Sequence, residues 1–404
     1  MMGSDRRIKI IQINTVCNGS TGGIMGSIQR KTIEEGYSAV SCYGRRSGYA
    51  DLPCIKFGNL ISFWIHVGIN TLFDLQGSGS FFATKRLIGY LRQEKPNVIH
   101  LHNLHGYYIN LNVLFDYLRE EYKGQIVWTF HDLWPITGHC PHFVQANCNK
   151  WTDRCHDCPQ KRDYPISYGL DMSRYNYAKK KRMFTELDNL TIICPSKWMK
   201  DCVKKSFLKE KDVRVINNGI DLSVFRPRRK LNSISGHDVS NKRIILGVAG
   251  VWEERKGLKV FKGLAKEISD EYLIVLVGLN KRQIKGLPKN IIGITKTTDR
   301  NMLAEIYSSA DVFVNPSTEE SFSLVTVEAI ACGTPVVVLD TSAVGELVTN
   351  TNGVVLHNPT IQDYIGAIYR ASKDSDRISA GAGHYSTNRM TSEVMELYRE
   401  KLGI

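Results

Sequence analysis

The sequence predicts an α/β protein made of two doubly wound domains, each with a parallel β-sheet covered by helices. Short runs rich in β-branched residues alternate with segments of helical periodicity along most of the 404 residues. This alternation is typical of parallel sheets whose two faces are both covered. This alternation is interrupted once, in the basic and polar stretch 225–243, and continues after it. The stretch is predicted to be a linker with an inserted loop.

The strands follow one another in two series. In the first half the runs are 8–13, 37–43, 97–102, 125–130, 190–194 and 213–218. In the second half they are 244–250, 272–278, 290–294, 311–316 and 334–339. We therefore place one domain at 1–222, a second at 223–385 and a last helix in 386–404. Since such sheets bind ligands beyond the carboxyl ends of their strands, the two domains are expected to face each other across a ligand-binding cleft.

Charge and hydropathy limit the partners and the location. A formal net charge of +13 favours anionic partners such as a nucleotide diphosphate, anionic lipid or nucleic acid. The most hydrophobic window, 59–75, is too short to span a bilayer, so it predicts a packed or partly buried helix, with a membrane-contacting helix as the alternative. The opening apolar run 8–13 is too short for a signal-peptide core, and ten mostly scattered cysteines suit a reducing compartment. A cytoplasmic protein is expected.

Glycines follow the first predicted strand. Gly19, Gly22, Gly23 and Gly26 precede a helical segment. Glycines let the backbone approach a ligand closely, and a helix N-terminus offers free N–H groups to an anion. An ordinary turn explains the same spacing.

The second half places cations where a phosphate group could bind. Gly250 ends a predicted strand, and Arg255, Lys256 and Gly257 come at the start of the next helix. Two cations beside a helix N-terminus can hold phosphoryl oxygens by charge and by hydrogen bonds. A solvated basic turn is the alternative.

Two glutamates stand at the next helix start. Glu320 lies in a loop and Glu328 lies about one turn inside the helix, among apolar neighbours. A carboxylate in that position needs hydroxyl or N–H donors, which a ribose diol would supply. The main-chain N–H groups of Ser323, Leu324 and Val325 would point out of the helix start and form a second anion pocket. Surface exposure is the usual alternative for a glutamate.

Taken together, these motifs resemble those of a known enzyme family. The pair Glu320 and Glu328, followed by EAIACGTPVVV, resembles the E-x7-E motif of retaining glycosyltransferases of group 1 (family 4), which have two Rossmann-like domains in the GT-B arrangement. NNGID (217–221), RKG (255–257) and SADVFVNPSTEESFS (309–323) match the family in the same order. TFHDLW (129–134), with the TGHC that follows, resembles the colanic-acid and capsule polysaccharide subgroup.

The resemblance implies roles in the second domain, which would bind the nucleotide sugar. Arg255 and Lys256 would hold the donor diphosphate, and Glu328 would bind the ribose hydroxyls. Glu320 would contact the transferred sugar and stabilise positive charge at its anomeric carbon. Many relatives carry an arginine where this sequence has Val251, so Arg255 is expected to take over that charge.

It also implies roles for the helix start and for the first domain, which would bind the acceptor. Ser323 and Leu324 would bind phosphate through their main-chain N–H groups. Gly22 and Gly23 would approach the donor phosphate and the acceptor, and His131 would lie near the reacting sugar. The C-terminal helix would brace the first domain. His102, at the end of 97–102, is expected to reach the same cleft.

The implied reaction moves a hexose from a UDP- or GDP-sugar to a surface-polysaccharide or lipid-linked glycan, with retention and without a catalytic metal. The competing D-x-D metal motif occurs only at Asp374–Asp376, in a polar segment that predicts a turn. The alternatives are a nucleotide-sugar epimerase or phosphorylase of the same fold and, from a different class, a zinc-stabilised nucleic-acid-binding protein. The last alternative leaves the two glutamates unexplained, so no nucleic-acid partner is expected.

A cysteine-rich insertion occupies about 132–168 and is expected to form part of the acceptor-side wall. Cys140, Cys148, Cys155 and Cys158 could bind a structural zinc ion, which favours such ligand sets. Reduced, packed cysteines and disulfides are the alternatives, and Trp134 and Trp151 could instead form the packing centre.

Two basic clusters could hold the first domain at an anionic membrane surface, which would make the protein peripheral to the inner face of the membrane. They are KKKR (179–182) and the lysines between 197 and 211. A solvated helix face explains them equally well.

Overall fold

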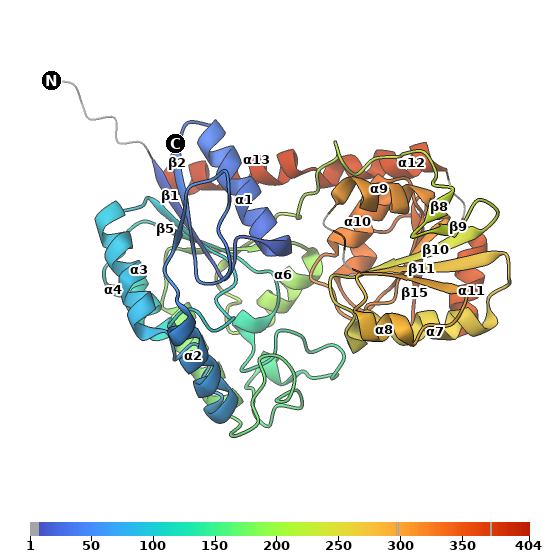
Figure 1. Ribbon diagram of the computed structural model, residues 1–404. Helices are drawn as coiled ribbons and strands as arrows, with labels where there is room; N and C mark the ends of the chain where they lie inside the picture. The colour runs from blue at the N-terminus through green and yellow to red at the C-terminus, as the bar shows by residue number, and fades with distance from the viewer. Residues whose placement is uncertain (1–7, 296, 298, 372–373) are drawn as a thin grey trace. The chain divides into compact units, whose positions relative to one another are not determined.

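The computed structural model describes residues 8–295, 297, 299–371 and 374–404. The chain forms two compact units (Figure 1): unit 1 comprises Met1–Asn217 and Met390–Ile404, and unit 2 comprises Asn218–Arg389. Each unit is a doubly wound α/β domain, so the predicted fold class is confirmed. The units divide a few residues before the predicted first boundary at 222 and a few residues after the predicted second boundary at 385.

The sheet of unit 1 has seven strands in the order β3-β2-β1-β4-β5-β6-β7, and every pairing is parallel. The central strands are apolar and almost fully buried, as expected for a parallel sheet covered on both faces. The strands are β1 (Lys9–Asn14), β2 (Ser38–Tyr43), β3 (Cys54–Lys56), β4 (Val98–Leu101), β5 (Gln125–Thr129), β6 (Leu190–Cys194) and β7 (Asp212–Val215).

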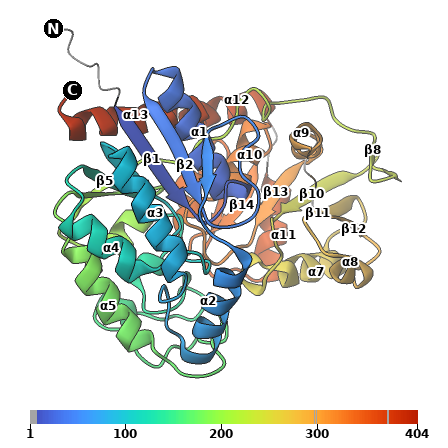
Figure 2. The ribbon, with the colours of Figure 1, turned by 60° about the vertical axis from the view of Figure 1, so that its left-hand side comes forward.

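Helices cover both faces of this sheet (Figure 2). They are α1 (Gly19–Glu34), α2 (Leu60–Phe73), α3 (Phe81–Glu94), α4 (Leu111–Glu120), α5 (Ser173–Thr185), α6 (Lys197–Lys204) and α13 (Thr387–Leu402), with short 3-10 turns η1 (Trp134–Ile136) and η2 (Lys150–Thr152). Among the described residues, none of the helices combines the length and apolar composition needed to cross a bilayer.

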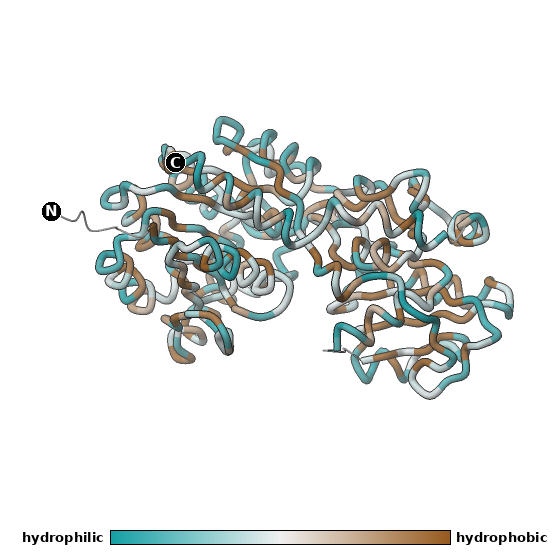
Figure 3. Tube along the Cα trace, turned by 90° about the horizontal axis from the view of Figure 1, so that it is seen from above, coloured by the Kyte–Doolittle hydropathy of each residue, from teal (hydrophilic) through white to brown (hydrophobic). Residues whose placement is uncertain are grey.

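The sheet of unit 2 repeats the same topology with six parallel strands, in the order β12-β11-β10-β13-β14-β15. Along the tube of Figure 3, apolar stretches alternate with polar ones, as strands and turns do. The strands are β10 (Arg243–Val248), β11 (Tyr272–Val277), β12 (Ile291–Ile294), β13 (Val312–Asn315), β14 (Val336–Leu339) and β15 (Gly353–Leu356).

Unit 2 also contains helices and short 3-10 turns. They are η3 (Glu254–Lys256), α7 (Leu258–Glu267), α8 (Lys281–Lys285), α9 (Arg300–Ser309), α10 (Leu324–Ala331), η4 (Ala343–Leu347), α11 (Ile361–Arg370), α12 (Ser375–Ala380) and η5 (Gly381–Tyr385). Asp374 caps α12 by accepting a hydrogen bond from the Arg377 N–H (3.2 Å). The predicted turn at Asp374–Asp376 is therefore the start of a short helix.

Both sheets reverse their strand order at one place. β1 pairs with β2 on one side and β4 on the other, and β10 likewise pairs with β11 and β13. Loops that leave neighbouring strands at such a switch point run to opposite faces, which opens a crevice at the carboxyl edge of the sheet. Each unit therefore has one topologically defined place for a ligand.

The sequence patterns missed the edge strands β3 and β15 and a small hairpin. The hairpin, β8 (Ser233–Ile234) and β9 (His237–Asp238), lies in the stretch predicted as a linker. Buried Ile234 and Val239 anchor this hairpin in the core of unit 2, so the stretch is structured.

The last helix, α13, belongs to unit 1 although it follows unit 2 in sequence. Its Val394, Leu397 and Tyr398 pack in one buried cluster with Ile10 of β1 and Val98 of β4. The Tyr398 hydroxyl also lies 2.6 Å from Nδ1 of His100. The core of unit 1 is therefore completed by residues from both ends of the chain.

Candidate active site

The switch point of unit 2 brings the loops after β10 and β13 together. The Thr318 N–H donates a hydrogen bond to the carbonyl of Arg255 (2.9 Å). Gly257 has φ of 73°, and a Cβ there would lie 2.7 Å from Cγ of Pro316. Only glycine fits this close approach. The turn that carries Arg255 and Lys256 is thus held against the loop that carries Glu320.

Lys256 and Glu320 form a largely buried ion pair. The Lys256 Nζ lies 2.5 Å from Oε1 of Glu320, and the two side chains are 17% and 12% exposed. Burial alone would raise the pKa of Glu320, but Lys256 and then Arg255 outweigh it and hold that pKa below its ordinary value. Glu320 is therefore ionised near neutral pH, and its burial in this loop is compensated by Lys256.

Arg255 lies beside this pair. Its Nη1 donates to the carbonyl of Glu319 (2.9 Å), while its Nε is buried without a hydrogen-bond partner. Gly250 follows β10 at the same edge of the sheet, and a Cβ there would meet no atom within 4 Å. Val251, next to it, is 65% exposed. The cations of this edge are therefore Arg255 and Lys256.

The start of α10 presents main-chain N–H groups at the same edge. Ser323 precedes the helix with φ of 81°, a strained conformation for a non-glycine residue. Its hydroxyl does not cap the helix; it accepts from Nδ2 of Asn315 (3.0 Å) and contacts Oγ1 of Thr326 (2.9 Å). The hydroxyl is used elsewhere, so it does not occupy the N–H groups at the start of the helix.

Glu328 lies in the second turn of α10 and is partly buried. The hydroxyl of Tyr307, from α9, donates to its Oε2 (3.0 Å). Burial raises the pKa of Glu328 to about 7, and the Tyr307 hydrogen bond only partly offsets that effect. The carboxyl thus has one donor and retains acceptor capacity. No sequence pattern pointed to Tyr307, because its role comes from the packing of α9 on α10.

The switch point of unit 1 places His131 at the end of a hydrogen-bonded chain. Gln12 of β1 donates its Nε2 to the carbonyl of Met25 (3.0 Å), so its Oε1 accepts from Nε2 of His102 (3.1 Å). Nδ1 of His102 lies 3.0 Å from Nε2 of His131, and the two rings stack. Because Gln12 fixes the proton of His102 on Nε2, His131 must be the donor in the last contact.

The chain therefore fixes the tautomer of His131. Burial lowers the pKa of His131 to about 4, so the ring is neutral near pH 7. With its proton on Nε2, the ring keeps Nδ1 as an acceptor. Such a group suits hydrogen bonding to a sugar hydroxyl better than proton donation. Gln12 was missed by the sequence analysis, although it is the one uncharged polar residue in the predicted strand 8–13.

The glycine-rich segment differs from the prediction. α1 begins at Gly19, so Gly22 and Gly23 lie inside its first turns and do not form a loop before it. A Cβ on Gly22 would lie 2.3 Å from the carbonyl carbon of Cys17, whereas a Cβ on Gly23 would meet nothing within 4 Å. Gly22 is thus required by packing, and Gly23 leaves an open surface near the N-terminus of α1.

The insertion places its four cysteines around one cavity. Cys140, Cys148, Cys155 and Cys158 line it together with His139. All four are free thiols. Within the described residues, no three His, Cys, Asp or Glu side chains are arranged to hold a metal ion. Phe143 and Trp151 stack at 4.6 Å nearby, so an aromatic pair forms part of the packing centre.

The basic cluster 179–182 is not a solvated face, as one alternative had it. Lys179 and Lys180 are 6% and 1% exposed. Lys180 donates to the carbonyls of Trp134 (2.8 Å) and Thr137 (3.1 Å), and its ammonium lies 3.3 Å from the Trp134 ring centroid. Lys180 therefore stabilises the insertion, and Lys179 donates to the Ser78 hydroxyl (3.0 Å) between α2 and α3. Both buried side chains are unavailable to a membrane, whereas Lys181 and Arg182 are exposed.

Comparison with known proteins identifies the family. Residues 59–224 match the model of "Glycosyltransferase Family 4", and residues 231–384 match "Glycosyl transferases group 1". The chain belongs to the group 1 glycosyltransferases. It is 25% identical over 364 residues to the "Putative colanic acid biosynthesis glycosyl transferase WcaC" of Escherichia coli K12, covering 86% of both chains. The family predicted from the motifs is confirmed.

Other relatives of this glycosyltransferase cover parts of the chain or share its fold. A "GDP-mannose-dependent alpha-(1-6)-phosphatidylinositol dimannoside mannosyltransferase" of Mycobacterium tuberculosis is 32% identical over 149 residues, 35% of this chain and 39% of that protein. The sucrose-phosphate synthase of Thermosynechococcus elongatus aligns over 98% of this chain and 100% of its own with a TM-score of 0.71 at 17% identity. HepE of Anabaena, solved with UDP-glucose, aligns over 98% and 100% with a TM-score of 0.66 at 15% identity.

The raised pKa of Glu328 predicts a pH-dependent cost to stability. A carboxyl with a raised folded pKa binds more protons in the folded state, so stability falls as the pH rises from about 4.5 to about 7. Glu328→Gln removes this cost, and we expect it to raise the free energy of unfolding by about 3 kcal/mol at pH 8 and by much less at pH 5. Urea unfolding at both pH values measures the difference. Glu271→Gln, at an exposed position, is the control and should show no such pH dependence.

Proposed function

We propose that this glycosyltransferase moves a hexose, with retention of anomeric configuration, from a UDP- or GDP-sugar to a surface-polysaccharide or lipid-linked glycan. The observation that carries the proposal is that Lys256 and Arg255 contact the loop of Glu319 and Glu320, which leads into the start of α10 at the same edge of unit 2. Cations and main-chain N–H groups are what a departing diphosphate requires, and a carboxylate is what a developing anomeric cation requires.

The proposed chemistry needs no metal ion. As the bond between the anomeric carbon and the phosphate oxygen breaks, negative charge grows on that oxygen, and Lys256, Arg255 and the α10 N–H groups stabilise it. The acceptor hydroxyl attacks from the same face, its oxygen bonds to the anomeric carbon, and its proton passes to the leaving phosphate. Glu320 stabilises the positive charge on the sugar, and Glu328 accepts hydrogen bonds from the ribose.

Relatives support the substrate classes. The name of the Mycobacterium tuberculosis relative specifies GDP-mannose, and HepE is solved with UDP-glucose. The E. coli relative is named for colanic acid, which supports a polysaccharide acceptor. In unit 1, we propose that the Nδ1 acceptor of His131 positions the transferred sugar and that the open surface at Gly23 admits the acceptor.

An epimerase or phosphorylase of the same fold remains the competing proposal, and one experiment separates the three. The purified protein is incubated with UDP-, GDP- and ADP-hexoses, with and without oligosaccharide acceptors, and the products are identified by NMR. We expect one nucleoside diphosphate to be released faster when the acceptor is present, and a glycoside with the anomeric configuration of the donor. Epimerised sugar, sugar phosphate or an inverted linkage would contradict the proposal.

Substitutions of the ion pair test the site directly. Lys256→Ala and Glu320→Ala should each lower kcat by about 100-fold or more, because each removes charge stabilisation in the transition state. Lys259→Ala is the matched control, since Lys259 is 85% exposed and its Nζ lies 2.5 Å from the exposed carboxylate of Glu254. Turnover is measured by nucleotide release.

Removing one partner leaves the other charge buried alone, which can also destabilise unit 2. The double variant Lys256→Met/Glu320→Gln keeps both positions neutral and should retain the fold while remaining inactive. Near-normal turnover of either single variant would refute the assignment.

A further inference from the structure

Helix α2 buries its polar face and exposes its apolar face, the reverse of an ordinary amphipathic helix. Its polar residues His66 and Asn70, together with Asp74 at its C-terminal cap, are spaced four apart and are 3%, 1% and 0% exposed. Nδ1 of His66 lies 3.0 Å from the Ser80 hydroxyl, and Nδ2 of Asn70 donates to the carbonyl of Ile166 (3.0 Å). Hydrogen-bonded polar groups therefore attach this helix to unit 1, together with Phe63, whose ring centroid lies 6.1 Å from that of Tyr107. The apolar side chains of the outward face are not used for that purpose.

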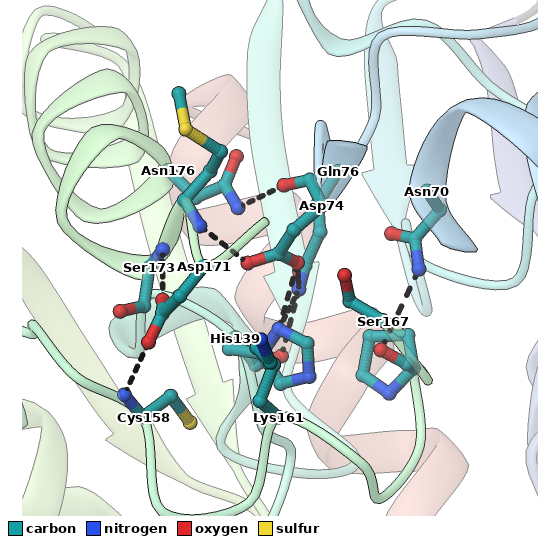
Figure 4. A network of polar contacts seen from close by, with 12 residues as sticks. Asn70, Asp74, Gln76, His139, Cys158, Lys161, Ser167, Asp171, Ser173 and Asn176 are labelled. Atoms are coloured by element: carbon teal, nitrogen blue, oxygen red, sulfur yellow. Dashed lines mark hydrogen bonds and ion pairs between the residues drawn. The ribbon is translucent and has the colours of Figure 1, made fainter. Parts of the chain in front are cut away.

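Asp74 joins α2 to the insertion (Figure 4). Its carboxylate accepts from Nδ1 of His139 (2.7 Å) and from the Met172 N–H (2.9 Å), and its carbonyl accepts from Nδ2 of Asn176 (2.6 Å). With these contacts the C-terminal end of α2 is fixed on three sides. The orientation of the helix is thus determined by polar contacts.

The outward face of α2 is apolar and exposed. Six large side chains on it are between 48% and 76% exposed: Leu60, Ile61, Trp64, Ile65, Leu72 and Phe73. The first residues of α3 add Phe81 (43%) and Phe82 (84%). Eight of the seventeen exposed large hydrophobic residues of the described chain therefore come from the two helices, within 23 consecutive residues. We name this surface the α2–α3 apolar surface.

A strand-like segment of the insertion extends this surface at one end. The N–H groups of Tyr168 and Leu170 donate to the carbonyls of Thr71 (2.9 Å) and Leu72 (3.1 Å). The side chains of Tyr168 and Leu170 are 64% and 56% exposed. An apolar surface built from three separate segments is larger than scattered surface hydrophobics and indicates an interaction site.

The exposed charges around the α2 and α3 part of this surface are positive. Between residues 52 and 93 the only acidic residue is Asp74, which is buried, whereas Lys56 and Lys85 are exposed. The Lys85 ammonium lies 4.7 Å from the ring centroid of Phe81, at the apolar surface itself. Within residues 52–93, aromatic and aliphatic side chains are flanked by cations and by no exposed acid, which complements the interface of an anionic bilayer. At the insertion end of the surface, Asp171 next to Leu170 is exposed.

We propose that the α2–α3 apolar surface docks unit 1 on the surface of an anionic phospholipid bilayer. α2 has 14 residues and is therefore roughly 21 Å long, so it lies along the membrane with its apolar face in the headgroup region. A second copy of this chain could also cover an apolar face, but a symmetric contact would bring the lysines of both copies together at one interface. The inference concerns a surface and depends on neither the donor nor the linkage.

Sedimentation with lipid vesicles tests the proposal. The full-length protein should bind vesicles of phosphatidylglycerol and phosphatidylcholine, bind phosphatidylcholine alone at least tenfold more weakly, and dissociate as salt increases. Ile61→Ser/Trp64→Ser should weaken binding at least tenfold through lost apolar burial. Lys56→Glu/Lys85→Glu should weaken it through charge and reduce its salt dependence.

The matched control is Met302→Ser/Tyr369→Ser, which removes apolar side chains that are 49% and 47% exposed in unit 2. It should leave vesicle binding unchanged. All variants should keep wild-type donor turnover with a water-soluble acceptor, so that loss of docking is distinguished from failure of the proposed enzyme activity. Equal binding by Ile61→Ser/Trp64→Ser, or loss of a dimer in that variant without any vesicle binding, would overturn the proposal.

A second inference concerns the insertion and rests on different residues. Nδ1 of His139 donates to the Asp74 carboxylate, while its Nε2 is buried without a hydrogen-bond partner. The same cavity is lined by the four thiols, and the Gly138 N–H points at Sγ of Cys155 (3.2 Å). Residues that bind a metal are typically held in place by hydrogen bonds of this kind, from a histidine to a carboxylate and from an N–H group to a sulfur.

We also propose that this cavity binds one zinc ion, which takes four of the five donors, at least three of them thiolates. Among the described residues these side chains are not arranged to hold a metal ion, so binding requires them to rearrange. The side-chain amine of Lys180 donates to the carbonyl of Thr137 (3.1 Å), which lines the cavity, and so braces its wall. Between η1 and α5, the described chain has only η2 as regular structure, so a metal would hold a segment that needs support.

Elemental analysis of the purified protein tests this inference. We expect about one zinc per chain, and strong loss of it together with a lower melting temperature in Cys140→Ser and Cys158→Ser. Cys54→Ser, a partly buried cysteine outside the insertion, is the control and should keep its zinc. Substoichiometric zinc that the Cys158→Ser change does not lower, or a Cys140–Cys158 disulfide found by mass spectrometry of the protein from the cytoplasm, would overturn it.

Discussion

Both units of this protein depend on one constraint. In each sheet a central strand pairs in parallel with two neighbours, and the order of the strands reverses at that place. β10 holds β11 and β13 in register, and β1 does the same for β2 and β4. The loops that follow these strands end at the same edge of their sheet, which is why Lys256 and Glu320 meet although 64 positions separate them. In unit 1 the same rule brings Gln12, His102 and His131 into one chain of hydrogen bonds.

Most buried charges of the candidate site are stabilised by specific partners. Glu320 is buried with a lysine at hydrogen-bond distance, whereas Glu328 receives only the Tyr307 hydroxyl and its pKa rises accordingly. The strained backbone of Ser323 is likewise compensated by a hydroxyl network with Asn315 and Thr326. The raised pKa of Glu328 and the strained backbone of Ser323 occur close together at the candidate site. Such unfavourable features are more typical of a binding site than of a core.

The sequence predicted the fold well because its two strand series are apolar, β-branched and regularly spaced. It predicted the cations and glutamates of unit 2 because their order is characteristic of the family. What it missed depends on tertiary packing: no local pattern shows that Tyr307 reaches Glu328 or that Gln12 sets the proton of His102. Lys179 and Lys180 looked like surface charges because burial of a lysine is rare and depends here on acceptors far along the chain, the Ser78 hydroxyl and the Trp134 carbonyl. Helix α2 was expected to be packed or partly buried, but its polar residues point inward.

Because α13 packs on unit 1, it affects how the chain folds during translation. Tyr398, Val394 and Met390 close a cluster with Ile10 and Val98, yet they are synthesised after all of unit 2. Unit 2 is contiguous and can complete its core as soon as it emerges. Unit 1, although translated first, must wait with an uncovered apolar groove until the final helix arrives. The nascent N-terminal half is therefore the stage at which this chain depends most on chaperones.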